Sequence, residues 1–189
     1  MLYGIVLAGG LSRRMGEDKA TQMLGDSTLL DIVTRTLLEA GCHEVKISSN
    51  QLPDAIRDDY TNYGPVAGIH ATVKAFLKEN KVGQILVVPV DMPILSAKTL
   101  QRLVNTAKQT NLTHFEDYQL PISLDLTPTS LETLRQLLDQ TSVDKGISLK
   151  RMFRDFNEHI ITVGSEQAHE FVNCNSKADL ETLRANYDK

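Results

Sequence analysis

Residues 7–19, which read LAGGLSRRMGEDK, combine the chemical groups that can surround a triphosphate. Glycines let backbone N–H groups approach phosphate oxygens closely. Arginine binds phosphate oxygens with a planar fork of donors, and lysine adds a compact charge on a flexible stem. The run has neither the GxxxxGK[ST] spacing of a Walker A loop nor the GxGxxG spacing of a dinucleotide-binding turn. We therefore expect a phosphate-binding loop of another kind, whose binding residues are Gly9, Gly10, Arg14 and Lys19.

A carboxylate follows the most strand-like run of the chain. Asp91 comes directly after the sequence QILVVPV (84–90) and precedes Pro93. An unpaired buried charge is costly, so such a carboxylate needs a cation or a hydrogen-bond donor nearby. Mg²⁺ prefers oxygen ligands and is often held by one or two carboxylates together with substrate phosphates. We expect Asp91 to hold Mg²⁺; the alternative is that Asp91 caps the helix that begins near Ser96.

Four segments in this order resemble the molybdenum cofactor guanylyltransferases, which are MobA-like nucleotidyltransferases. They are residues 7–19, GPVAGI at 64–69, VDMP at 90–93 and FVNCNS at 171–176, so the resemblance extends along nearly the whole chain. It implies an α/β fold of the three-layer, Rossmann-like (GT-A-like) kind. Such a fold has a mainly parallel sheet with helices on both faces.

The resemblance also implies which residues contact the nucleotide. Leu7, Ala8 and the other members of the first segment would surround the phosphates. Asn50, at the end of the second expected strand, matches an asparagine that contacts the guanine base. Asp58 or Asp59 matches an aspartate that faces the nucleotide, and counting back from Gly64 favours Asp58. Gly64 would allow a close backbone approach at the mouth of the site.

The late segment is expected to lie at the acceptor end of the site. Asn173 and Asn175 alternate along an extended run, so their side chains should share a face with Phe171, while Val172 and Cys174 point to the other face. An amide offers donors and an acceptor, which suits a pterin edge or a ligand phosphate. The alternative is local, because Asn175 or Ser176 can cap the last helix.

The activity implied by the resemblance is transfer of GMP from GTP to the phosphate of Mo-molybdopterin. The products would be molybdopterin guanine dinucleotide and pyrophosphate. Arg14 and Lys19 would neutralise the triphosphate while Asp91 holds Mg²⁺, the implied cofactor. Partners would be proteins that carry molybdopterin or deliver the cofactor to molybdoenzymes.

Two other functions remain open on the sequence. One is a related transferase that uses CTP or a sugar-phosphate acceptor; family members that transfer cytidylyl groups tend to read LAAG where this chain has Gly9-Gly10. The other is a catalytically silent nucleotide-binding protein. A broken Lys19 or Asp91 would be expected there, and both are intact.

Alternating strand and helix patterns in the first half predict right-handed βαβ units. Short apolar runs predict strands at 3–8, 44–49, 84–90, 121–126 and 159–163. Helical spacing of apolar residues predicts helices that carry residues 29–38, 66–77, 100–107, 131–138, 149–153 and 180–183. Ser27 or Thr28 can cap the first of these helices, and Gly41 stands where it should stop. The polar stretch 108–119 has no periodicity and predicts a surface loop.

Composition predicts one cytoplasmic domain that spans residues 1–189. Hydrophobic residues make up 41% of the chain and charged residues 23%, values typical of globular proteins. The net charge of −4 argues against a nucleic-acid partner. The two cysteines form no metal-binding pattern, and no apolar run is long enough for a membrane span. His70 and Lys74 lie one helical turn apart, and we expect both on a solvated helix face.

Overall fold

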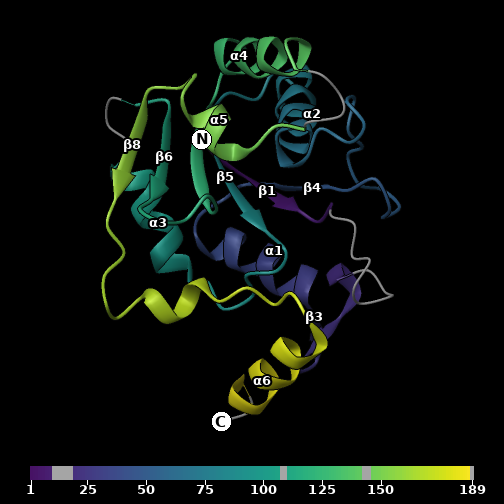
Figure 1. The fold of residues 1–189 in the computed structure, drawn as a ribbon, viewed down its shortest axis with the longest axis vertical. Helices are drawn as coiled ribbons and strands as arrows, with labels where there is room; N and C mark the ends of the chain where they lie inside the picture. Colours follow the sequence, from purple (N-terminus) through teal and green to yellow (C-terminus); the bar gives the residue numbers. More distant parts are fainter. Residues whose placement is uncertain (10–18, 107–109, 142–145, 188–189) are drawn as a thin grey trace.

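The computed structural model describes residues 1–9, 19–106, 110–141 and 146–187. A six-stranded sheet, in the order β4-β1-β5-β7-β6-β8, runs through its centre (Figure 1). β1 pairs in parallel with β4 and β5, and β6 pairs in parallel with β8, whereas β7 is antiparallel to both of its neighbours. The expected mainly parallel sheet of an α/β fold is thus confirmed. The strands are β1 (Leu2–Leu7), β4 (Val45–Ser48), β5 (Gly83–Pro89), β6 (Leu112–Phe115), β7 (Ile122–Leu126) and β8 (Glu158–Ile161).

Helices cover both faces of this sheet. Buried side chains of α2, α4 and α5 pack on one face, and those of α1, α3 and α6 pack on the other. β1 serves both layers because its side chains alternate: Ile5 points into the first layer and Val6 into the second. The helices are α1 (Leu29–Glu39), α2 (Pro65–Lys78), α3 (Ala97–Thr106), α4 (Pro128–Asp139), α5 (Leu149–Phe153) and α6 (Lys177–Tyr187). No helix among the described residues is long and apolar enough to cross a membrane.

The first helix begins and ends where the sequence predicts. Thr28 Oγ1 accepts a hydrogen bond from the Asp31 N–H at 3.0 Å, and the Asp31 carboxylate accepts one from the Thr28 N–H at 3.2 Å. This reciprocal pair satisfies two donors that a helix start leaves free. After α1, Gly41 adopts a positive φ of 103°, which glycine tolerates without strain and which turns the chain toward β4.

One strand of the central sheet and a short two-stranded hairpin were missed by hydrophobic spacing. The stretch 108–119 is not a surface loop in its described part, because it contains the buried strand β6 between β7 and β8. The strand was missed because it contains polar residues. One of them, His114, is buried: its ring stacks on Phe153 at 4.5 Å between centroids, and it lies 3.2 Å from a Glu158 carboxylate oxygen. The hairpin of β2 (Met23–Leu24) and β3 (Ser27–Thr28) is also new, and its strands are too short to show a pattern.

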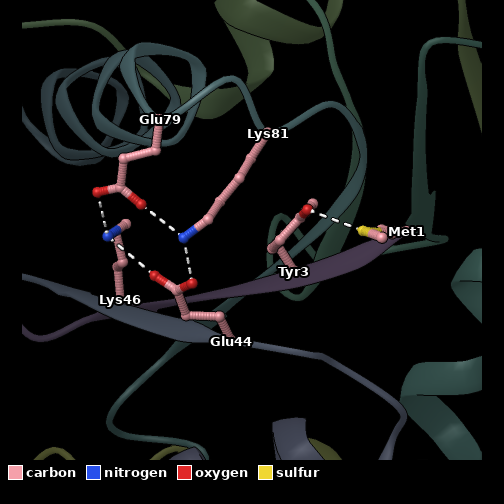
Figure 2. Close-up of polar contacts among 6 residues, drawn as sticks. All are labelled: Met1, Tyr3, Glu44, Lys46, Glu79 and Lys81. Atoms are coloured by element: carbon pink, nitrogen blue, oxygen red, sulfur yellow. Dashed lines mark hydrogen bonds and ion pairs between the residues drawn. The ribbon is translucent and has the colours of Figure 1, made fainter.

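A ring of four charged side chains closes the C-terminal end of α2 (Figure 2). Lys46 Nζ lies 2.9 Å from carboxylate oxygens of both Glu44 and Glu79, and Lys81 contacts the same two carboxylates. Both ammonium groups also face the ring of Phe76, at 5.0 and 5.6 Å from its centroid. At 1.5 Å per residue, this ion-pair ring lies about 20 Å from the N-terminus of α2.

Candidate active site

The carboxyl ends of β4, β1 and β5 meet at one edge of the sheet. The Ala8 N–H donates to the Ser48 carbonyl at 2.9 Å, and the Val90 N–H donates to the Leu7 carbonyl at 3.0 Å. The chain after β1 therefore leaves between the ends of its two neighbours, where ligands bind in open α/β sheets. Since adjacent strands are about 4.8 Å apart, the ends of β4 and β5 lie about 10 Å apart across β1, and Asn50 and Asp91 follow these two ends.

Lys19 joins the end of β5 to the late segment of the chain. Its ammonium group lies 2.7 Å from Asn175 Oδ1 and 3.8 Å from Asp91 Oδ2. The backbone makes a second link, because the Cys174 N–H donates to the Asp91 carbonyl at 2.7 Å. Three of the four motifs thus meet within one small cluster, the 7–19 segment being represented there by Lys19.

Asp91 is a largely buried carboxylate with the Lys19 ammonium group beside it. Only 25% of its side chain is exposed, and burial raises the pKa of this carboxyl above its ordinary value, an effect that the nearby Lys19 partly opposes. A divalent cation would offset the same desolvation. Among the described residues there is no group of three or more metal-ligand side chains. A single carboxylate fits Mg²⁺, which takes its other ligands from water and substrate phosphates.

Asn50 and Asp58 form a reciprocal pair on the other side of β1. Asn50 Nδ2 donates to Asp58 Oδ2 at 2.9 Å, and the Asp58 backbone N–H donates to Asn50 Oδ1 at 2.9 Å. Because both bonds involve the Asn50 amide, they fix its orientation and hold the carboxylate in place. Burial raises the pKa of Asp58, whereas the Asn50 hydrogen bond acts in the opposite direction.

Glycines allow α2 to approach this edge closely. Gly64, at the helix N-cap, has a φ of 78°, and Pro65 begins the helix. A Cβ at Gly68 would collide with Ser48 Oγ and would lie 3.4 Å from both Asp58 Oδ1 and a Leu7 methyl group. The GPVAGI segment therefore packs directly beneath the Asn50–Asp58 pair, and Gly68 is the member that the close packing requires.

Asp59 points away from the pair formed by its neighbour. Its carboxylate lies 2.8 Å from Lys74 Nζ and 3.7 Å from His70 Nδ1, both on α2. The expectation of a solvated His70 is wrong: its side chain is buried, and the ring of Tyr60 packs edge-on against it at 5.3 Å between centroids. α2 is covered by the chain around Tyr60 and by α4, so only Lys74 of the two residues reaches solvent.

The late segment departs from the expected alternation. Phe171 and Cys174 are both buried, while Asn173 and Asn175 are exposed. Phe171 ends a short 3₁₀ helix, η3 (Ala168–Phe171), which turns its ring into the core against Phe115. Its position is therefore set by that turn rather than by a strand-like repeat.

The cap of the last helix does not use the Asn175 side chain. Ser176 Oγ accepts from the Asp179 N–H at 3.2 Å, and the Asp179 carboxylate accepts from the Asn175 and Ser176 N–H groups at 2.9 and 2.8 Å. The Asn175 amide is thereby left to contact Lys19. The side chains of Ser176 and Asp179 thus cap the last helix, whereas the Asn175 side chain contacts Lys19.

Comparison with known proteins identifies the family. The MobA-like NTP transferase domain matches residues 4–159 of the chain. The chain belongs to this family. A molybdenum cofactor guanylyltransferase of Xanthomonas euvesicatoria pv. vesicatoria is 35% identical to it over 92% of this chain and 89% of the relative. Another, from Aliivibrio salmonicida, is 28% identical over 94% of this chain and 92% of the relative.

Solved structures share the fold of this MobA-like domain. Molybdopterin-guanine dinucleotide biosynthesis protein A from Archaeoglobus fulgidus has a TM-score of 0.76, with 19% identity and coverage of 100% of this chain and 99% of that chain. A 4-diphosphocytidyl-2C-methyl-D-erythritol synthase from Anaerococcus prevotii has a TM-score of 0.74, with 12% identity and coverage of 100% and 96%. These likenesses show a common architecture.

The expected site residues of the MobA-like domain divide into two groups. Leu7, Ala8, Gly9, Asn50 and Asp58 lie around the ends of β1 and β4, with Gly64 at the N-cap of α2, and Lys19, Asp91 and Asn175 lie together beside β5, with Asn173 two residues away. Gly10 and Arg14 lie outside the described residues. The sequence did not point to Gly68 or to the contact of Asn175 with Lys19. The second glycine of the GPVAGI segment is Gly68, and its place in that segment was the sequence feature from which its role could have been inferred.

Proposed function

We propose that this MobA-like domain transfers GMP from GTP to the phosphate of Mo-molybdopterin, forming molybdopterin guanine dinucleotide and pyrophosphate. The observation that carries the proposal is the position of Lys19 between Asp91 and Asn175. It supplies a cation, a carboxylate and an amide at the edge that also bears the Asn50–Asp58 pair. The names of the guanylyltransferase relatives support the same reaction.

The chemistry is in-line displacement at the α-phosphorus of GTP. An oxygen of the acceptor phosphate forms the new P–O bond as the bond to the β-phosphate breaks, and pyrophosphate leaves. The acceptor oxygen is already ionised, so no covalent protein intermediate is needed, and catalysis depends on orientation and charge neutralisation. Lys19 and Arg14 would neutralise the triphosphate, and the Gly9 and Gly10 amides would orient it. Mg²⁺ held by Asp91 would offset the phosphate charges.

The Asn50–Asp58 pair would recognise the base. An ionised carboxylate only accepts hydrogen bonds, and guanine presents an N–H and an amino group side by side on one edge. Adenine presents an acceptor at one of those positions. Asp58, whose Oδ2 is oriented by the Asn50 amide, is therefore suited to guanine.

The exposed late asparagines would contact the acceptor. Asn173 is exposed two residues from Asn175, whose amide oxygen orients Lys19. An acceptor placed there would lie beside the carboxyl end of β5, close to the phosphates. We place the reaction in the cytoplasm, where GTP is available, with proteins that carry molybdopterin or deliver the cofactor to molybdoenzymes as partners.

The assay that tests this function compares nucleotides. Purified protein is mixed with Mg²⁺, Mo-molybdopterin and GTP, CTP, UTP or ATP, and pyrophosphate and dinucleotide are measured. The expected result is product with GTP, little with the others and none after chelation of Mg²⁺, with Lys19→Ala as an impaired control. Equal product from CTP would favour a cytidylyltransferase. Tight GTP binding without pyrophosphate release would favour a silent nucleotide-binding protein.

A further inference from the structure

Two neighbouring carboxylates are turned to opposite sides of the chain. Asp58 faces Asn50 at the sheet edge, with which it shares two hydrogen bonds. Asp59 faces α2, where its carboxylate lies 2.8 Å from Lys74 Nζ. Because consecutive Cα atoms are a fixed 3.8 Å apart, the position of one carboxylate restricts the other.

The segment around Asp59 is also attached to α4. Tyr60 donates its hydroxyl hydrogen to Asp139 Oδ1 at 2.6 Å, and Arg135 holds the other oxygen of Asp139 at 2.6 Å. Tyr60 and Arg135, together with Asp59 and Lys74, line part of a cleft of about 560 Å³ between α2 and α4. The segment that carries Asp58 is thus held by contacts with both α2 and α4.

α2 is held firmly enough in the fold to position the segment that carries Asp58 and Asp59. Its inner face is buried, and the missing side chain at Gly68 lets it lie against Ser48 and Asp58. Lys74 stands on the same helix, less than two turns further along. The helix therefore contacts Asp58 through Gly68 and Asp59 through Lys74. Because the two aspartates are adjacent and both are held against α2, a change in the Asp59–Lys74 contact should shift the position of Asp58.

We infer that Asp59, through its ion pair with Lys74, is a positioning residue that sets the Asp58 carboxylate for recognition of the nucleobase. The inference rests on the proposed function, since it concerns the guanine selectivity of that same site. Lys74 also balances the charge of Asp59, which would otherwise disfavour a second carboxylate ion on the adjacent residue. In agreement with this, the Asp59 charge contributes to raising the pKa of Asp58.

An exposed ion pair of this kind adds little to the stability of a fold. The side chains of Asp59 and Lys74 are 41% and 37% exposed, so solvent screens their attraction. If the pair is only a surface contact, its loss changes neither stability nor nucleotide choice. If it positions Asp58, its loss changes nucleotide choice alone, and the two roles can be separated.

The test compares Lys74→Met with wild type by calorimetric titration of GTP and ATP in the presence of Mg²⁺. The ratio of GTP affinity to ATP affinity should fall by roughly threefold to thirtyfold in Lys74→Met, because positioning residues alter couplings by that amount. ATP affinity and the melting temperature should stay unchanged, since the phosphate site is not involved. Asp59→Asn should give the same loss of selectivity, and Lys74→Arg should retain most of it.

Lys78→Met is the matched control, because Lys78 lies on the same helix one turn further along and is exposed. It should leave the affinity ratio unchanged. Unaltered selectivity in both Lys74→Met and Asp59→Asn would overturn this inference alone, as would an equal loss of affinity for GTP and ATP. A wild-type protein that does not distinguish GTP from ATP would overturn both this inference and the guanylyl assignment.

Discussion

The Lys19 ammonium group lies 2.7 Å from the side-chain oxygen of Asn175, although 156 positions separate the two residues in the chain. The lysine of the segment expected to bind phosphate is therefore oriented by the segment expected at the acceptor. A rigid lysine loses less side-chain entropy when it binds a phosphate than a free one does. We accordingly expect the amide to act in nucleotide binding as well as near the acceptor.

Replacing the two late asparagines should separate these roles. Asn175→Ala should weaken GTP binding by about tenfold, because Lys19 loses its orienting contact. Asn173→Ala should leave GTP affinity unchanged and raise the KM for Mo-molybdopterin. Both variants should keep their free energy of unfolding within about 0.5 kcal/mol, because the helix cap uses Ser176 and Asp179. Calorimetry, steady-state kinetics and thermal unfolding check these outcomes; a pure stability loss in Asn173→Ala would place the acceptor elsewhere.

Removing the charge of Asp91 should affect activity and stability in opposite directions. Burial raises the folded-state pKa of this carboxyl, so the fold is destabilised by the ionised form at neutral pH and is relieved as the pH falls through the folded-state pKa. Asp91→Asn should therefore keep or slightly raise the melting temperature at pH 7. Turnover should fall by about 10² or more, because a metal-holding group is lost. Near-normal turnover at ordinary Mg²⁺ concentrations would make Asp91 a structural residue.

The buried imidazole of His70 should make the fold sensitive to mild acid. Burial lowers its pKa; Asp59 and Asp139 act against that shift, and Lys74 and Arg135 act with it. The unfolded chain then binds the proton more readily than the folded protein. Stability should consequently fall as the pH drops below about 6.5, the range in which an unburied histidine titrates.

The measurement is the melting temperature from about pH 5 to pH 7 for wild type and His70→Gln, which removes the titrating group and keeps a polar side chain. The wild-type slope should be steeper than that of the variant. His43→Gln serves as control, because His43 is exposed. Equal slopes in all three proteins would mean that His70 is not the group that responds to acid.

The ion-pair ring at the far end of α2 should respond to stronger acid. Hydrogen bonds from Lys81 and Lys46 lower the pKa of Glu79 to about 2, and the same two lysines lower the pKa of Glu44 (Figure 2). A lowered folded-state pKa gives stability that is complete above the unfolded-state pKa and is lost as the pH falls toward about 2.

Glu79→Gln should flatten the loss of melting temperature between about pH 4.3 and pH 2, relative to wild type. Added salt should reduce the difference between the two proteins, because the ring is partly exposed. Nucleotide affinity should not change, since the ring lies at the opposite end of α2 from Gly64. A wild-type curve as flat as that of the variant would contradict the pKa assigned to Glu79.

The helices of the first half and its strands in the central sheet follow from local patterns, and so does the edge at which they place Asp91 and Asn50. Continuous apolar runs mark β1 and β5, and the Thr28–Asp31 capping box marks the start of α1. β6 was not predicted because two of its buried residues, Thr113 and His114, are polar, and polar residues normally indicate a surface position. Neighbours in sequence cannot reveal the facing directions of Asp58 and Asp59, which are decided by contacts with Asn50 and Lys74.

The order of the strands has a consequence for how this kind of enzyme can change its acceptor. β4, β1 and β5 all come from residues 2–89, whereas β7, β6 and β8 come from residues 112–161. One uninterrupted stretch of gene therefore encodes the strands that end at the proposed nucleotide site, and they emerge from the ribosome before the others. Insertions and replacements after residue 91 can remodel the second half of the sheet while the parallel ladders of the first half stay intact. We expect that a laboratory exchange of the chain after residue 91 between relatives, with Asn175 kept so that its contact with Lys19 remains, would change the acceptor and leave the nucleotide unchanged.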